Sequence, residues 1–192
     1  MKPWPALLLL AISLVGCSTA RTEITKKNNR IEAASYSFVI AADQGWYMQR
    51  DEKGERITLT KQAGPIVWQI MFYKNILLAD QLAAASAEAV ADDFRKLEVQ
   101  VMMEEGVKKG KYQLRDIKMG EEIVGDRAFY TLEHVALSPS LMQRASMYLY
   151  FPQAKNNRYF FVAHYFETTA PGVAAKSLKD EFLSALASLT VK

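Results

Sequence analysis

The strongest constraint on the fold is a change in the spacing of apolar residues along the chain. Four early segments alternate apolar and polar residues or are apolar throughout, which is typical of β-strands. These segments are residues 36–40, 46–49, 56–60 and 66–73. From Asp80, which suits an N-cap, the chain contains no Gly or Pro before Gly106, and its apolar residues form a helical stripe. We therefore predict strands first and then a helix from Asp80 to about Glu104.

The second half of the chain repeats this order of strands followed by a helix. Apolar segments separated by turn signals predict strands at 112–119, 121–124, Arg127–Leu137, 145–151 and 158–167. Residues 171–189 carry apolar side chains on one helical face and predict a final helix. Successive hairpins indicate an antiparallel sheet, and two amphipathic helices must cover its apolar surface. The sequence thus predicts an α+β fold, an α-β-α sandwich with two main helices.

Cysteine content and charge exclude several functional classes. The chain contains one cysteine, Cys17, so it has no internal disulfide and no zinc or iron–sulfur site with several cysteine ligands. The formal net charge of +3 over 192 residues is too small to indicate nucleic acid. We expect no nucleic-acid partner, no cofactor and no bound metal.

The first residues are organised like an export signal. Lys2 supplies a positive start, and an apolar run of about ten residues follows, well short of the roughly 20 that span a bilayer. The next segment, Leu14-Val15-Gly16-Cys17, resembles the bacterial lipobox. This resemblance implies cleavage before Cys17 and attachment of lipid to its sulfur, with palmitate-type acyl chains. The alternative is an ordinary signal peptide that ends near Cys17 or Ala20.

The lipobox resemblance also sets the predicted domain boundaries and location. Residues 1–16 are predicted to be the signal peptide, 17–35 the lipidated N-terminus and a flexible tether, and 36–192 a single domain. Ser18 after the cysteine implies the outer membrane, facing the periplasm, if the envelope has two membranes. The expected location is the cell envelope, where the lipid holds the chain at a membrane.

Short motifs in the domain resemble those of PsbP-like and DcrB-like domains. The first is Tyr36-Ser-Phe-Val-Ile40 followed by Gly45-Trp46, and the second is Val124-Gly125-Asp126-Arg127-Ala128. The resemblance covers roughly residues 35–192 and includes a terminal helix after two long strands. It implies an α-β-α sandwich without a shared active site, often lipid-anchored or lumenal, that generally acts as an accessory or binding module.

Candidate catalytic residues are few. His134 and His164 lie in predicted strands and could act as metal ligands or as an acid/base couple, but we expect each to be a strand histidine satisfied by a neighbour or by solvent. The doublets Glu104-Glu105 and Glu121-Glu122 lie near element ends, where solvated carboxylates are common. The chain has no nucleophile-elbow, P-loop or dinucleotide-binding motif. We therefore do not expect an enzyme, with an unrecognised hydrolase as the remaining alternative.

Aromatic residues are the remaining functional signal. Most of them should pack in the core, since central strands favour aromatic side chains. Trp46 and Tyr47, which follow Gly45 at a turn, are the pair that we select as a possible partner or ligand surface. The sequence favours a lipid-anchored accessory protein that binds another envelope protein. The alternative is a module that binds a small ligand or a lipid between sheet and helix.

Overall fold

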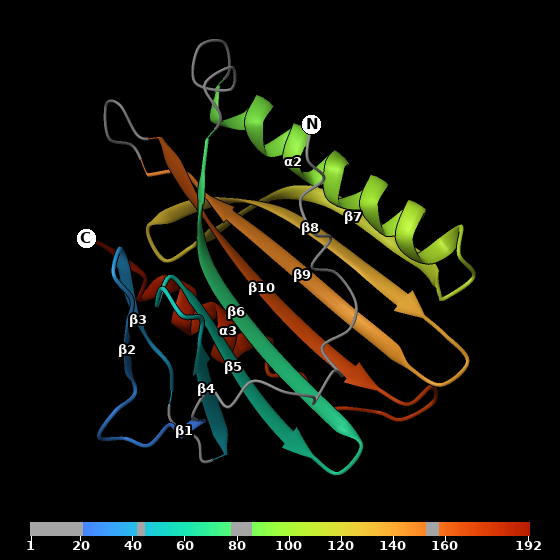
Figure 1. Cartoon of the computed structure of the whole chain (residues 1–192), viewed down its shortest axis with the longest axis horizontal. Helices are drawn as coiled ribbons and strands as arrows, with labels where there is room; N and C mark the ends of the chain where they lie inside the picture. The colour runs from blue at the N-terminus through green and yellow to red at the C-terminus, as the bar shows by residue number, and fades with distance from the viewer. Residues whose placement is uncertain (1–20, 42–44, 78–85, 153–157) are drawn as a thin grey trace.

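The computed structural model of the chain describes residues 21–41, 45–77, 86–152 and 158–192. Within these residues, eight strands form one large antiparallel sheet and three strands form a smaller one (Figure 1). The order in the large sheet is β1 (Thr22–Glu23), β4 (Trp46–Arg50), β5 (Arg56–Ala63), β6 (Ile66–Ile76), β10 (Tyr159–Thr169), β9 (Met142–Tyr150), β8 (Arg127–Leu137) and β7 (Gln113–Val124). The small sheet has the order β11 (Thr190–Val191), β3 (Tyr36–Val39) and β2 (Arg30–Glu32). Strands β1 and β7 are therefore the edges of the large sheet.

Two α-helices and one π-helical turn complete the described elements. Helix α2 (Ala87–Met102) begins after Ser86, whose side chain accepts a hydrogen bond from the Ala89 amide. It continues into the π-helix η1 (Met103–Val107), where Gly106 lies against the ring of Tyr112. Helix α3 (Lys179–Ala187) follows the last long strand.

The two helices cover opposite faces of the large sheet. In β10, Phe160 and Val162 belong to the hydrophobic cluster that includes α2, whereas Phe161 and Ala163 belong to the cluster that includes α3. Alternate side chains of a strand point to opposite faces. The sheet therefore has an α2 face and an α3 face, and the latter also carries the small sheet.

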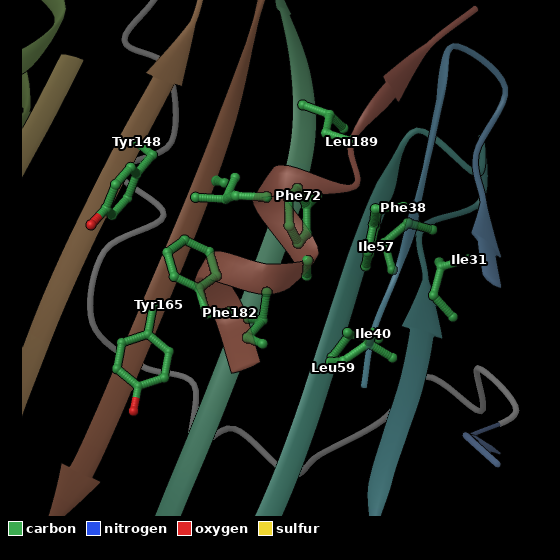
Figure 2. Close-up of a cluster of buried hydrophobic side chains, with 14 of the residues drawn as sticks. Ile31, Phe38, Ile40, Ile57, Leu59, Phe72, Tyr148, Tyr165, Phe182 and Leu189 are labelled. Carbon is green, nitrogen blue, oxygen red and sulfur yellow. The ribbon is translucent and has the colours of Figure 1, made fainter. Parts of the chain in front are cut away.

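The α3 face holds the larger core (Figure 2). Phe182 of α3 is fully buried, with its ring centre 5.3 Å from that of Tyr148 and 5.6 Å from that of Tyr165. Phe38 of the small sheet stacks on Phe72 of β6 at 4.1 Å. Apolar burial of this extent is the main stabilising term in a chain that has one cysteine and no disulfide.

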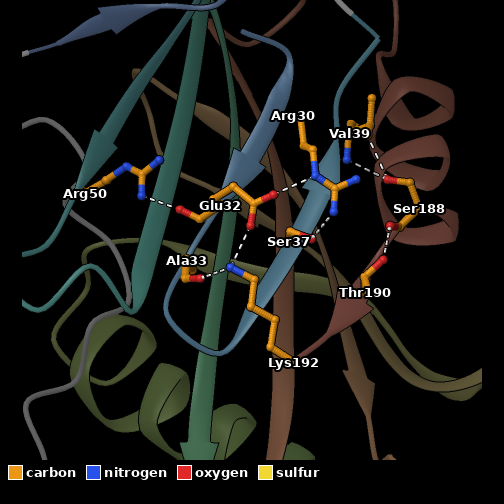
Figure 3. A network of polar contacts seen from close by, with 9 residues as sticks. All are labelled: Arg30, Glu32, Ala33, Ser37, Val39, Arg50, Ser188, Thr190 and Lys192. Atoms are coloured by element: carbon orange, nitrogen blue, oxygen red, sulfur yellow. Dashed lines mark hydrogen bonds and ion pairs between the residues drawn. The ribbon is translucent and has the colours of Figure 1, made fainter.

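The C-terminus closes the small sheet against the first described segment (Figure 3). Strand β11 pairs with β3, and the Lys192 amide donates to the Ser35 carbonyl at 3.0 Å. The Lys192 ammonium lies 2.6 Å from a Glu32 carboxylate oxygen and donates to the Ala33 carbonyl at 2.8 Å. The two ends of the described chain are thereby joined.

These contacts correct the predicted tether. Residues 21–35 were expected to be flexible, but β1 pairs with β4 and β2 pairs with β3. Ile24 and Ile31 are each 1% exposed. Sequence reasoning treated these two isoleucines as isolated because neither belongs to a sustained alternating pattern, although Ile31 pairs with Phe38 and the Ile24 amide donates to the Trp46 carbonyl. The prediction is wrong for the described part of that segment, and residues 17–20 lie outside the described residues.

Three element boundaries also differ from prediction. The predicted N-cap Asp80 lies outside the described residues, and α2 begins after Ser86 instead. The strands predicted at 112–119 and 121–124 form one strand, β7, with a bulge between Arg115 and Lys118. The final helix begins only at Lys179, because Pro171-Gly172 forms a turn with Gly172 at φ 82°. The predicted α+β fold class is nevertheless confirmed, and the strand Arg127–Leu137 is found with its predicted bounds.

Candidate functional site

Cys17, the predicted lipidation site, lies outside the described residues. Its modification and the membrane attachment therefore stay predictions. In the part of the chain that the structure describes, no helix is both long enough and apolar enough to cross a membrane.

The structure separates the predicted surface pair Trp46 and Tyr47. Trp46 is fully buried, and its indole Nε1 donates to Glu181 Oε2 at 3.0 Å, so it belongs to the core and the prediction is wrong for this residue. Tyr47 is 43% exposed. Successive strand residues point to opposite faces, so one of two adjacent aromatic residues in a half-covered strand is expected to be buried.

The two histidines lie on the α2 face and are both buried. His164 stacks between Tyr73 and Phe166, with ring centres 5.8 and 5.4 Å away, and its Nε2 lies 3.2 Å from the Tyr73 hydroxyl. Both ring nitrogens of His134 are buried and have no hydrogen-bond partner in the part of the chain that the structure describes. Burial lowers the pKa of His134 to about 4, and burial first, then the charges of His134 and Arg56, lower the pKa of His164 to about 3. Both rings are therefore neutral near pH 7.

Neither histidine is part of a metal site in the described residues, which contain no group of three or more His, Cys, Asp or Glu side chains that could hold a metal ion. The expectation that each is satisfied by a neighbour or by solvent is confirmed for His164, but it is wrong for His134, whose ring nitrogens are buried and have no partner among the described residues. The glutamate doublets are not brought together either. Glu105 pairs with Lys109, and Glu122 accepts a hydrogen bond from the Tyr148 hydroxyl at 2.6 Å.

Sequence reasoning missed Glu98 of α2, whose pKa burial raises to about 7. Its charge contributes, after burial, to a raised pKa of the Tyr73 hydroxyl. The Arg56 guanidinium lies 5.7 Å from the Tyr73 ring centre on the same face. No sequence signal indicated this group, because Glu98 lies on α2, whereas Tyr73 and Arg56 come from the neighbouring strands β6 and β5.

A charged cavity of about 210 Å³ opens on the α3 face, beside the N-terminal end of α3. Its charged lining residues come from five elements: Asp116, Lys118, Glu133, Arg144, Glu167 and Lys179. The Lys179 ammonium lies 2.6 Å from Glu133 Oε1, and this contact is the main cause of a lowered pKa of Glu133. Arg144 pairs with the buried Glu167 at 2.7 Å. The cavity could accept a small ligand with both charge signs, although typical ligand pockets measure about 300–1,000 Å³.

The edge strand β7 carries three exposed large apolar side chains, including the most exposed one in the described residues. Ile123 is 77% exposed, Met119 43% and Ile117 41%. Met119 and Ile123 pair with β8 residues in the register that puts them on the α2 face, in line with Leu132 of the α2 cluster. On its other side β7 has no described strand neighbour. We call Ile117, Met119, Ile123 and the free backbone groups of β7 the β7 edge surface.

Comparison with known proteins finds solved structures with a partly similar fold, and their sequence identities and TM-scores are low. No family model and no curated protein matches the chain. The solution structure of a cyanobacterial PsbP from Synechocystis is 13% identical, with a TM-score of 0.48, over 93% of this chain and 99% of that one. LpqN, involved in cell envelope biogenesis of Mycobacterium tuberculosis, is 9% identical, with a TM-score of 0.44, over 90% of each chain.

A crystal structure of a protein from Bacteroides thetaiotaomicron is 11% identical, with a TM-score of 0.45, over 84% of this chain and 47% of that one. This chain therefore spans about half the length of the Bacteroides protein. Similarities at this level carry no argument about function. The fold class follows from the sheet and the two helices themselves.

Proposed function

We propose that the chain is a non-catalytic module of the bacterial cell envelope that acts by binding another envelope component. A lipid on Cys17 holds it at a membrane, and Ser18 favours the outer membrane, facing the periplasm. The observation that carries the proposal is the β7 edge surface. An edge strand with free N–H and C=O groups and exposed apolar side chains is a template for pairing with another chain.

The contacts of the reactive side chains support a binding role over a catalytic one. His164 is held between two aromatic rings, and Lys179 and Arg144 are paired with carboxylates. A base and a nucleophile within hydrogen-bond reach would be needed for hydrolysis. His164 Nε2 and the Tyr73 hydroxyl do lie 3.2 Å apart, but burial raises the pKa of that hydroxyl and lowers the pKa of His164, so the hydroxyl ionises poorly and the imidazole is a weak base. Among the described residues, the ring nitrogens of His134 have no hydrogen-bond partner.

The anchor is tested by mass spectrometry of the mature N-terminus. We expect diacylglyceryl and acyl groups on Cys17 and no residue before it. The Cys17→Ala variant, which removes the chain's single thiol, should leave the membrane fraction. An unmodified Cys17, or a Cys17→Ala chain that remains in the membrane fraction, would refute the anchor without affecting the binding surface.

The binding surface is tested by a photo-crosslinking residue at Ile123 in the full chain in cells. We expect a reproducible protein adduct from this position. The matched control places the same photo-crosslinking residue at Tyr47. Tyr47 is also exposed, but it lies on β4, near the opposite edge of the large sheet. Absence of any adduct from Ile123, or equal adducts from both positions, would contradict the proposal.

The charged cavity supports a second candidate function, the binding of a small zwitterionic molecule. Its lining presents the ammonium of Lys179 and the carboxylate of Glu167 in one cavity. Titration with free amino acids should then raise the melting temperature of the chain, and Glu167→Gln should abolish the rise. No shift with any amino acid would exclude this ligand class.

A further inference from the structure

The basic residues of β7 lie in its first half and two of its acidic residues lie in its second half. Arg115 and Lys118 are in the first half, together with Asp116, and Glu121 and Glu122 are in the second. All residues of β7 from Arg115 to Glu121 are exposed. The exposed apolar residues flank Gly120, with Ile117 on one side and Ile123 on the other. When a second copy of the strand runs antiparallel to the first, this order can place basic residues opposite acidic ones and an isoleucine opposite an isoleucine.

Antiparallel pairing of β7 with itself about a two-fold axis at Gly120 gives two matched pairs, whereas Met119 would lie opposite Glu121. Lys118 would lie opposite Glu122 of the second strand, and Ile117 would lie opposite Ile123. Both pairs occur twice by symmetry, and each joins residues on the same face of the sheet. Opposite charges and apolar side chains directly across two strands stabilise the pair.

The neighbouring registers are poorer. With the axis at Met119, Asp116 would face Glu122, and Ile117 would face Glu121. Like charges would then replace the Lys118–Glu122 pair, and the contact between the two isoleucines would be lost. With the axis at Glu121, Lys118 would face Val124 and lose its carboxylate partner. The two-fold axis must pass through a residue and not between two residues. Only then do directly opposite residues of the two copies belong to the same face of the sheet.

We propose that β7 pairs antiparallel with β7 of a second copy of this chain, about a two-fold axis at Gly120. This inference rests on the proposed binding role of the β7 edge surface and names its partner. Pairing joins two eight-stranded sheets into one and satisfies the free backbone groups of both edges. It also covers Ile123, the most exposed of the large apolar side chains in the described residues.

Local contacts hold the centre of β7 in place for this pairing. The buried Arg95 of α2 donates to the Gly120 carbonyl at 2.8 Å and to the Thr131 carbonyl of β8 at 3.1 Å. A Cβ on Gly120 would lie 3.6 Å from Thr131 Oγ1, an ordinary contact. The fold itself therefore does not require glycine here, whereas at a two-fold axis the residue meets its own copy. The bulge at Arg115–Lys118 ends the regular pairing on one side.

Cysteine crosslinking in the full chain carrying Cys17→Ala tests the register, because each added cysteine is then the only thiol. In the proposed pair the two copies of residue 120 lie directly opposite, at a Cα separation of about 4.5–5.5 Å, within disulfide range. We expect Gly120→Cys to form a disulfide-linked dimer under mild oxidation. The two copies of residue 123 are six positions apart, about 20 Å along the strand, so the Ile123→Cys control should not crosslink.

A mixed experiment checks the register independently. Ile117→Cys and Ile123→Cys chains should each form no disulfide-linked dimer when oxidised alone, and they should form a disulfide-linked heterodimer when mixed. Rapid crosslinking of Ile123→Cys alone, or no crosslinking of Gly120→Cys, would overturn the proposal. Circular dichroism of each variant confirms that it is folded.

Charge reversal tests the pairing without new thiols. The Lys118→Glu chain should dimerise about tenfold more weakly than the wild-type chain, as measured by sedimentation equilibrium. The substitution places a like charge opposite Glu122 at both symmetry-related pairs. The double variant Lys118→Glu/Glu122→Lys should restore it. Equal dimerisation of all three proteins would refute the pairing. If a residue at Ile123 crosslinks to a different envelope protein while Gly120→Cys does not dimerise, the binding role stands and the second copy is excluded. If neither crosslinks, both fail.

Discussion

His134 is expected to make the fold sensitive to acid. Its ring is 7% exposed, and neither nitrogen has a hydrogen-bond partner. Burial lowers its pKa from 6.5 to about 4. Below pH 6.5 the unfolded chain therefore binds a proton that the folded chain does not bind until about pH 4. Protonation in this window favours the unfolded state, so stability falls as the pH is lowered.

The size of this effect follows from the pKa difference. One pKa unit corresponds to about 1.4 kcal/mol, so His134 should reduce the free energy of unfolding by about 2 kcal/mol between pH 7 and pH 5. The full effect, reached below pH 4, is about 3 kcal/mol. Replacing His134 by Leu removes both the titration and two unpartnered nitrogens. The second change should raise stability at pH 7 by about 1–3 kcal/mol.

Urea denaturation of the wild-type and His134→Leu chains at pH 7 and pH 5 provides the measurement. The variant should be more stable at both pH values, and its loss of stability between them should be smaller by about 2 kcal/mol. Carboxylates and His164 titrate in both proteins, so their contributions largely cancel in the difference. If the two proteins lose the same free energy between pH 7 and pH 5, His134 is not buried in an unpartnered state and the reasoning is wrong.

Three further substitutions test the packing. Phe182→Ala should lower the free energy of unfolding by about 3–5 kcal/mol, measured by urea denaturation, because the ring is fully buried and Ala leaves a cavity. Gly106→Ala should lower the melting temperature sharply, because its Cβ would lie 1.7 Å from Cζ of Tyr112; an unchanged melting temperature would contradict the contact. Trp46→Phe removes the hydrogen bond to Glu181 and should cost about 2 kcal/mol in chemical denaturation, and a neutral result would show that the indole contributes only apolar area.

The periodicity of apolar residues by itself determined the fold class and many of the elements. Alternation identified Arg127–Leu137 with its bounds, and a helical stripe located α2. Both patterns are local, because the side chains of one strand or helix repeat every two or 3.6 residues. The predicted export signal and the predicted lipidation of Cys17 likewise rest on a contiguous motif, which no tertiary contact is needed to recognise.

Tertiary structure alone decided which residues are buried and which edges are free. Ile24 and Ile31 looked like parts of a tether because their partners lie in strands that a local pattern cannot assign to them. Trp46 and Tyr47 are adjacent in sequence, but the strand pleat sends them to opposite sides. The exposure of Ile123 depends on β7 being last in the sheet, and strand order is set by long-range pairing of hairpins rather than by any single segment. The sequence thus determined the elements and the anchor motif, whereas packing between distant segments decided the surface available for binding.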